Sequence, residues 1–368
     1  MRLKAAGTEA SRVLRARRDS IAEHVTSLYF WARPRLERRR EGGRRKCTED
    51  NRSHVDYLCE ALSFEQPSLL TEYGAWAAEL LAHLHIRREE LAFNLELLRT
   101  TLSQELEGES GALASCYLDA ALARIGRAVP GAHATVGFLS GSGALDVLAR
   151  DYLARVLRGD RHGACRLVVD DAARGTSVRD IYLLVFQRVL REVGRLWHSN
   201  QIGVAQEHYC TACTLFTMSQ LYPRIFSEKR NGLRMVAASV AGDLHEIGLR
   251  MVSDFFEMEG WDTFCLGANT PISGILQQVA ERAPQVLAIS ATMTFHIHAV
   301  ADLITATRDA GNAPRILVGG GAFNSVPGLW KDVGADGYAA DAADAVALAA
   351  GWCAELPVLR VQALAVGR

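Results

Sequence analysis

Apolar positions recur at helical spacing through the first two thirds of the chain and gather into short runs in the last third. Between residues 49 and 106 the spacing predicts successive amphipathic helices, one of which begins at Pro67 while another runs from Arg87 to Leu106. A further helix is expected over residues 111–129. The buried stripe of the helix that ends at Leu106 should be Leu91, Leu95, Leu98 and Leu102.

The pattern changes twice in the second half of the chain. Residues 181–213 are strongly apolar and periodic, which predicts two helices separated by a short break at Gly203. From Val236 to Val240 the chain reads as a strand that is buried on both faces, and similar short runs follow it. This alternation of strands and helices predicts an open, doubly wound parallel sheet.

Three short motifs lie where strands of this sheet should end. They are separated by 41 and 26 residues, and ligands of open α/β sheets bind outside the carboxyl ends of the strands. The motifs are therefore placed to share one site. They read Asp243-Leu244-His245-Glu246-Ile247-Gly248, then Ser290-Ala291-Thr292, then Gly319-Gly320.

The order and spacing of these motifs resemble the cobalamin-binding module of methionine synthase and methylmalonyl-CoA mutase, which carries DxHxxG, SxL and GG. The chain departs once, because Thr292 stands where the family has Leu. The resemblance implies that His245 is the lower cobalt ligand. It also implies that Asp243 holds the other imidazole nitrogen, as carboxylates beside metal-bound histidines do.

The remaining motif residues are assigned to the cofactor's nucleotide tail. Ser290 would form a hydrogen bond with that tail, beside Thr292. Gly319 and Gly320 lack a Cβ, so the backbone can lie close against it, and Gly248 completes the first motif.

A second pattern precedes the sheet. Trp197-His198 is followed by Glu207-His208, with nine residues (198–206) between Trp197 and Glu207. Within a helical cap this Wx9EH pattern resembles the light-dependent repressors of the CarH type, in which adenosylcobalamin senses light. The resemblance implies that Trp197, Glu207 and His208 surround the adenosyl group. It also implies that His198 becomes the upper cobalt ligand after light has broken the Co–C bond.

The helices before the cap resemble the haem-free globin-like sensor domains of stressosome proteins. Joined to a cobalamin unit of the CarH type, they resemble the photocobilins, which hold cobalamin and biliverdin together. That resemblance implies a non-covalent biliverdin site, for which an apolar slot with aromatic, cationic and histidine side chains is needed. The candidates by residue type are Tyr73, Trp76, His83, His85, Arg87, Arg88 and His133.

The expected fold class is α + α/β: a globin-like helical domain, a four-helix-bundle cap, and a flavodoxin-like five-stranded parallel sheet that binds cobalamin. The expected divisions are a basic segment (1–46), the globin-like domain (47–130), a linker (131–144), the cap (145–228), the cobalamin domain (232–353) and a tail (354–368).

The expected function is a light sensor without enzymatic activity, in which photolysis of adenosylcobalamin changes domain packing or self-association, with a protein partner as the output. One alternative is a corrinoid methyl carrier of a methyltransferase system, and another is a light-dependent regulator that binds DNA. A radical isomerase is least expected, because no large substrate barrel is present in the sequence.

Composition and charge narrow the picture further. The net charge of −1, the 49% hydrophobic content and the absence of a long apolar run or signal peptide predict a soluble, cytoplasmic protein. The eight cysteines are scattered without a zinc-like arrangement, and the Cys210–Cys213 pair falls inside a predicted helix, which favours core packing.

The first 46 residues hold 14 Lys or Arg and 5 Asp or Glu, which leaves a local charge of +9. A contact with nucleic acid is one interpretation. Because no DNA-binding motif accompanies the charge, a solvated helix followed by a loop is favoured, and nucleic acid is not the expected partner.

Overall fold

In the computed structural model, residues 2–37, 42–127, 137–226, 229–311 and 313–354 are described. They divide into two compact units. The first is Met1–Leu221 with Met293–His298, and the second is Tyr222–Thr292 with Ala299–Arg368. None of the described helices is both long enough and apolar enough to cross a membrane, and the expected cytoplasmic location stays a prediction.

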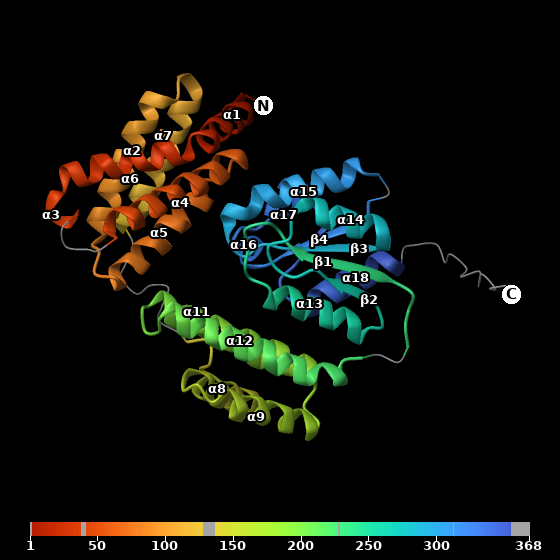
Figure 1. Ribbon diagram of the computed structural model, residues 1–368. Helices are drawn as coiled ribbons and strands as arrows, with labels where there is room; N and C mark the ends of the chain where they lie inside the picture. The colour runs from red at the N-terminus through yellow and green to blue at the C-terminus, as the bar shows by residue number, and fades with distance from the viewer. Residues whose placement is uncertain (1, 38–41, 128–136, 227–228, 312, 355–368) are drawn as a thin grey trace. The chain divides into compact units, whose positions relative to one another are not determined.

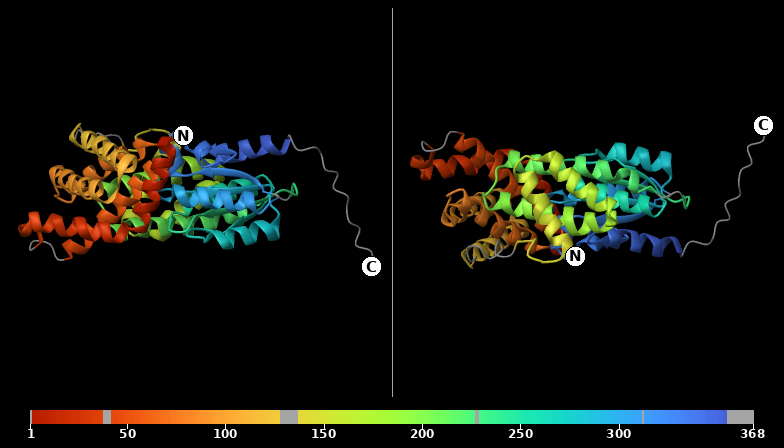
Figure 2. Two further views of the ribbon diagram at one scale, coloured as in Figure 1. Left: turned by 90° about the horizontal axis from the view of Figure 1, so that it is seen from above. Right: turned by 90° about the horizontal axis from the view of Figure 1, so that it is seen from below.

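The chain up to residue 127 is helical in its described parts, as the sequence predicts (Figures 1 and 2). The predicted start at Pro67 is confirmed, since proline fits the first helical turn. The predicted leucine stripe is also confirmed, because its four side chains are at most 3% exposed. The helices are α1 (Arg2–Ala16), α2 (Arg18–Ala32), α3 (Pro34–Glu37), α4 (Gly43–Ser63), α5 (Pro67–His83), α6 (Arg88–Glu105) and α7 (Gly108–Arg127).

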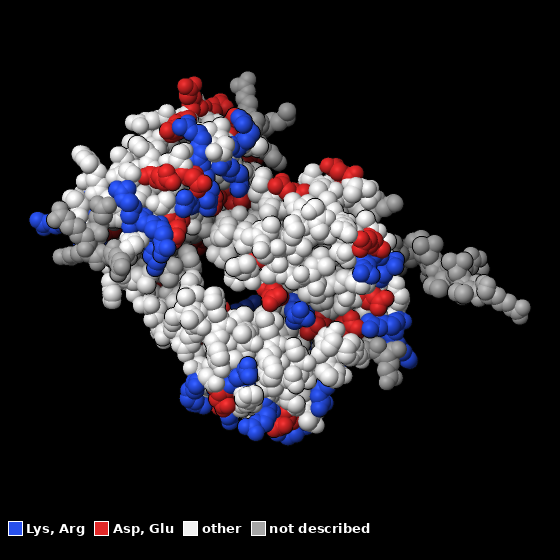
Figure 3. Space-filling view, viewed as in Figure 1, with Lys and Arg blue, Asp and Glu red and all other residues white. Residues whose placement is uncertain are grey.

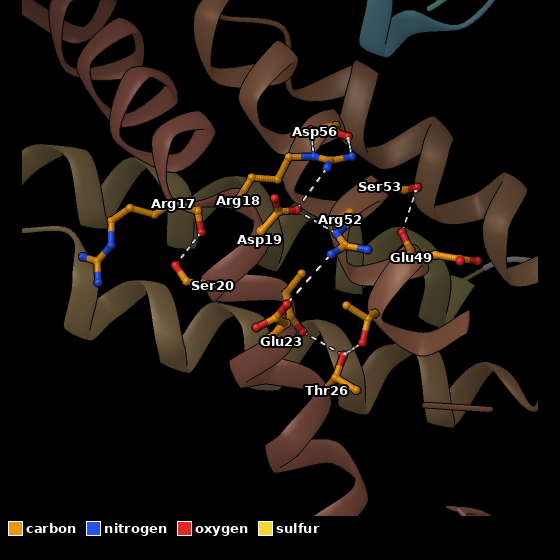
Figure 4. A network of polar contacts seen from close by, with 12 residues as sticks. Arg17, Arg18, Asp19, Ser20, Glu23, Thr26, Glu49, Arg52, Ser53 and Asp56 are labelled. Carbon is orange, nitrogen blue, oxygen red and sulfur yellow. Dashed lines mark hydrogen bonds and ion pairs between the residues drawn. The ribbon is translucent and has the colours of Figure 1, made fainter. Parts of the chain in front are cut away.

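Ion pairs between α2 and α4 use part of the basic charge of the N-terminal segment (Figure 4). Arg18 contacts both carboxylate oxygens of Asp56, at 2.6 and 2.5 Å. Arg52 lies 2.7 Å from Asp19. On the face drawn in Figure 3, basic and acidic side chains lie side by side over these helices. Part of the basic charge of this segment is therefore used in ion pairs between helices.

The cap is a four-helix bundle, as predicted. Its third helix is formed by three continuous segments, and Gly203 lies in the short connection before the fourth helix. Its core contains Tyr152, Tyr182 and Phe186, all fully buried, and the Tyr152 hydroxyl donates to Thr214 Oγ1 at 3.2 Å. The elements are α8 (Ala144–Leu157), α9 (Arg161–Ala173), α10 (Val178–Asp180), the π-helical η1 (Ile181–Phe186), α11 (Gln187–His198) and α12 (Val204–Leu221).

The end of the predicted linker is attached to the cap. The Phe138 amide donates to Glu192 Oε2 at 3.0 Å, and Arg188 Nε donates to the Phe138 carbonyl at 3.0 Å. Residues 128–136, which include the first six residues of the linker, and residues 355–368 of the tail lie outside the described residues. The domain boundaries themselves stay predictions.

The second unit contains the predicted five-stranded parallel sheet, with strand order β2-β1-β3-β4-β5. This is the flavodoxin-like order, in which the strand order reverses between the neighbouring parallel strands β1 and β3. Its strands are β1 (Arg234–Ser239), β2 (Asp262–Cys265), β3 (Val286–Ser290), β4 (Arg315–Gly319) and β5 (Gly337–Ala339).

Helices cover both faces of the sheet (Figure 1). On one face Leu249 and Phe256 of α13 pack with Ala345 and Ala349 of α18 over buried residues of the strands. The elements between and around the strands are η2 (Tyr222–Arg224), α13 (Ile247–Met258), α14 (Ile272–Arg282), η3 (Thr294–His296), α15 (Ile297–Asp309), α16 (Gly321–Ser325), α17 (Leu329–Asp332) and α18 (Ala342–Ala354).

Candidate functional site

The first motif forms the loop between β1 and α13. Asp243 is completely buried in this loop. Its Oδ1 accepts the backbone N–H of His245 at 3.0 Å and lies 2.8 Å from Nδ1 of the same residue. Asp243 therefore fixes both the backbone and the ring of His245, while 58% of the histidine side chain stays exposed.

The same aspartate joins the first motif to the second. Its Oδ2 accepts the backbone N–H of Thr292 at 2.7 Å, directly after β3. Because Asp243 is buried, these hydrogen bonds compensate the carboxylate for the water it has lost. The ends of β1 and β3 are thus held together at the point where the strand order reverses.

Asn269 also supports this loop, although it lies outside the three sequence motifs. Its side-chain oxygen accepts a hydrogen bond from the backbone N–H of Gly242 at 2.8 Å. Its own backbone N–H donates to the Asp243 carbonyl at 2.9 Å. Its backbone has φ +52°, a left-handed conformation that asparagine tolerates. The run Gly267-Ala268-Asn269-Thr270-Pro271 after β2 is the signal that could have indicated this turn.

The glycines of the third motif pack against the loop of the second. Gly320 has φ +97°, and a Cβ there would lie 2.5 Å from the Ala291 carbonyl and 3.1 Å from Ser290 Oγ. A Cβ on Gly319 would lie 3.0 Å from the Ala339 carbonyl. Neighbouring segments of the chain itself thus require glycine at both positions, in addition to any approach of a ligand.

Gly320→Ala should therefore destabilise the protein by about 1–3 kcal/mol, since it adds a steric conflict to an unfavourable φ. Gly248→Ala is the matched control: Gly248 lies in α13, and nothing is within 4 Å of a Cβ built there. Urea denaturation of both variants would measure the difference. Equal free energies of unfolding for wild type and Gly320→Ala would contradict this reading.

In the cap, Trp197 and His198 end α11, and Glu207 and His208 lie in the first turn of α12. Glu207 Oε2 lies 2.6 Å from His208 Nδ1, and its Oε1 accepts the Thr211 hydroxyl at 3.0 Å. The Trp197 side chain is half-buried. The predicted Trp197 and Glu207 are thus brought to facing ends of two consecutive helices.

His198 contacts the N-terminal helices. Its ring stacks on Trp76 with centroids 5.3 Å apart, and its Nε2 lies 3.1 Å from the Trp76 carbonyl oxygen. The adjacent Asn200 donates to the His83 carbonyl at 3.2 Å. One of the two ring nitrogens of His198 is therefore engaged by α5, and its predicted role as a cobalt ligand stays a prediction.

Several of the residues proposed for biliverdin are engaged in contacts within the protein. Tyr73 is buried, lies 2.7 Å from His54 Nδ1 and stacks on Tyr57. Burial raises the pKa of Tyr73 and lowers the pKa of His54 to about 4. The basic candidates form surface ion pairs, Arg87 with Glu90 and Arg88 with Glu89, His85 is exposed, and His133 lies outside the described residues.

Comparison with known proteins identifies two domains of the chain. Residues 233–347 match a family model described as a B12 binding domain, and residues 148–222 match a second model of the same description. The chain therefore carries a B12-binding domain together with the helical cap that precedes it.

The chain belongs to the family of corrinoid proteins that contain these domains. It is 30% identical to the dimethylamine corrinoid protein of Methanosarcina barkeri over 165 residues, which are 41% of this chain and 76% of that protein. It is 32% identical to dimethylamine corrinoid protein 3 of Methanosarcina acetivorans over 126 residues, 33% of this chain and 57% of that protein. The match thus spans a little over half the length of the latter relative.

The fold is shared with the monomethylamine corrinoid protein of Methanosarcina barkeri, whose structure superposes with a TM-score of 0.51. It is 21% identical, and the match covers 57% of this chain and all of that one. This agreement is evidence for the fold alone.

These findings correct the predicted light sensor. The relatives are corrinoid proteins, so the resemblance to the CarH-type repressors and photocobilins was wrong, as was the light-signalling function. The physical reason is that the helical cap is itself a part of B12-binding proteins, so Trp197 and Glu207 within it do not distinguish a light sensor. Biliverdin has no support from the relatives or from the contacts of its candidate residues.

Proposed function

We propose that this chain is a corrinoid protein that carries a methyl group on cobalamin and works with a separate methyltransferase. The observation that supports this most strongly is His245, an exposed imidazole anchored through Nδ1 to a fully buried carboxylate at the carboxyl end of β1. The relatives named for dimethylamine indicate a methylated amine as the class of methyl donor. The chain is then a carrier, and the partner enzyme catalyses the transfer.

The residues present fit the cofactor. A side chain that has to bind cobalt needs an accessible nitrogen and a fixed ring, and His245 has an exposed ring held by Asp243. Gly248, three residues later, has open space around it, where a side chain would otherwise project. Cobalamin supplies a cobalt ion that accepts and releases a methyl group.

Each of the motif residues has a distinct part in this proposal. His245 would bind the cobalt, and Asp243 orients its ring and increases its basicity through the hydrogen bond to Nδ1. Ser290, Thr292, Gly319 and Gly320 would hold the nucleotide tail. In the cap, Trp197, Glu207 and His208 stay candidate contacts of the cofactor.

The test is the uptake and methylation of cobalamin by the purified full chain. After incubation with hydroxocobalamin and gel filtration, we expect near-stoichiometric cofactor with a spectrum typical of histidine-bound cobalt. With a reductant, dimethylamine and a dimethylamine methyltransferase, the spectrum should change to that of methylcobalamin. Failure to retain hydroxocobalamin would contradict the proposal, and retention without methylation would contradict the methylated amine as donor.

A further inference from the structure

Glu60 of α4 is a completely buried carboxylate that does not belong to the motifs of the cofactor site. Its Oε1 lies 2.7 Å from a guanidinium nitrogen of Arg15 in α1. Its Oε2 accepts the backbone N–H of His298 at 3.0 Å. Both oxygens are therefore used, one to join two helices and the other to hold a residue 238 positions later in the chain.

His298 belongs to a short segment that begins next to the second motif. Met293–His298 follows Ser290-Ala291-Thr292 directly and groups with the helical unit rather than with the sheet. The Phe295 ring contacts the Tyr57 ring edge-on at 5.4 Å. A hydrogen bond between Tyr57 and Thr294 opposes part of the rise that burial causes in the pKa of Tyr57. Helix α4 thus holds this segment at three of its six residues.

A continuous series of ring contacts leads from this segment to the end of the cap. Tyr57 stacks on Tyr73 with centroids 3.6 Å apart, Tyr73 lies 6.2 Å from Trp76, and Trp76 stacks on His198 at 5.3 Å. We call Phe295, Tyr57, Tyr73, Trp76 and His198 the aromatic bridge. The bridge connects the chain after the second motif with the residue next to Trp197, through α4 and α5.

We propose that Glu60 is a positioning residue for the cofactor site: together with the aromatic bridge it fixes the segment Met293–His298, and through it the adjacent Thr292 loop, from the N-terminal helices. This inference rests on the proposed function for its cofactor, but the contacts of Glu60 do not depend on a ligand. It assigns the N-terminal helices a part in cobalamin binding, although neither B12-binding model includes them.

The ionisation of Glu60 adds a pH dependence to this contact. Burial raises the pKa of Glu60 to about 7, against the opposing effects of Arg15 and of the His298 amide, while Asp56 adds to the rise. Cys59 is a further titratable group beside the Arg15–Glu60 pair. An ionised carboxylate accepts a stronger hydrogen bond than a neutral carboxyl group. The hold on His298 should therefore tighten as the pH rises through about 7.

The experiment is hydrogen exchange of the full-length, cofactor-free protein, combined with titration of hydroxocobalamin. In Glu60→Ala, exchange of the amides in residues 293–298 should become at least tenfold faster, and the dissociation constant for cobalamin should rise about five- to tenfold. Glu60→Gln keeps the shape and an acceptor oxygen. It should show a smaller change, and should also lose the pH dependence of exchange around pH 7.

Glu49→Ala is the matched control. It removes a carboxylate of the same helix that pairs with Arg45 at 3.8 Å, and this carboxylate makes no contact with the segment among the interactions of the described residues. Its exchange at 293–298 and its cobalamin affinity should equal those of the wild type. Unchanged exchange in Glu60→Ala, or equal effects in Glu49→Ala, would overturn the positioning role.

The cofactor titration separates this inference from the proposed function. Faster exchange with unaltered cobalamin affinity would overturn the connection between Glu60 and the cofactor site. If the wild type itself did not bind cobalamin, the proposed function would fail and that connection with it. Hydrogen exchange would still show whether Glu60 holds the segment.

Discussion

His245→Ala is expected to weaken cobalamin binding by at least 10–100-fold, the range reached when even an outer partner of a metal ligand is removed. The remaining bound cofactor should lose the spectrum of histidine-coordinated cobalt. The reason is local: Asp243 anchors Nδ1, so the rest of the exposed ring is oriented for a ligand, and no other histidine shares this anchor among the described residues.

The control for this prediction is His162→Ala, which removes an exposed histidine at the start of α9. Equilibrium titration with hydroxocobalamin, followed by absorption spectroscopy, measures both affinity and coordination. Asp243→Asn should fall between the two, because the amide can keep one hydrogen bond but cannot accept all those made by the carboxylate. A His245→Ala protein with the wild-type spectrum would show that another group binds cobalt.

The sheet and its motifs could be predicted from the sequence because their signals are local. A run of buried β-branched and small residues indicates a parallel strand, and polar or glycine residues directly after it lie at the ligand-binding edge. That reasoning placed Asp243, Ser290 and Gly319 at neighbouring strand ends, where the structure has them. It could not show that Asp243 bonds to Thr292, since that contact joins loops 49 positions apart.

The function was misread in the cap for a related reason. A Trp-His pair and a Glu-His pair at a fixed distance describe the ends of two consecutive helices, and the cap that carries them matches a B12-binding model. The tertiary contact of His198 with Trp76 on α5 was also hidden from the sequence. Periodicity cannot reveal this contact, because the two residues are 122 positions apart.

The N-terminal helices show the same limit. Their helical pattern and leucine stripe follow from spacing, but Glu60 falls on an apolar face where an acidic residue is unexpected. A buried carboxylate is retained only where it has partners, and here the partners come from α1 and from the segment after β3. A single acidic residue on a buried helical face was the one sequence signal for this arrangement.

The second large effect is expected in the pH dependence of stability. Burial raises the pKa of Glu60 from 4.5 to about 7, so the folded state binds this proton more tightly than the unfolded state. The stabilisation from the protonated form is complete below about pH 4.5 and is lost as the pH rises through about 7. A shift of this size corresponds to roughly 3 kcal/mol in the free energy of unfolding.

Glu60→Gln removes this titration, so its stability relative to wild type should increase by roughly 3 kcal/mol between pH 4 and pH 8. Urea denaturation at several pH values measures the difference. Glu9→Gln is the control, because the Glu9 carboxylate is exposed and its pKa is lowered by Arg12, so that its effect should have the opposite sign. A constant difference between wild type and Glu60→Gln would mean that the pKa of Glu60 is the same in the folded and unfolded states. In that case the Arg15 pair would offset burial, and the hold on His298 would not change as the pH rises through about 7.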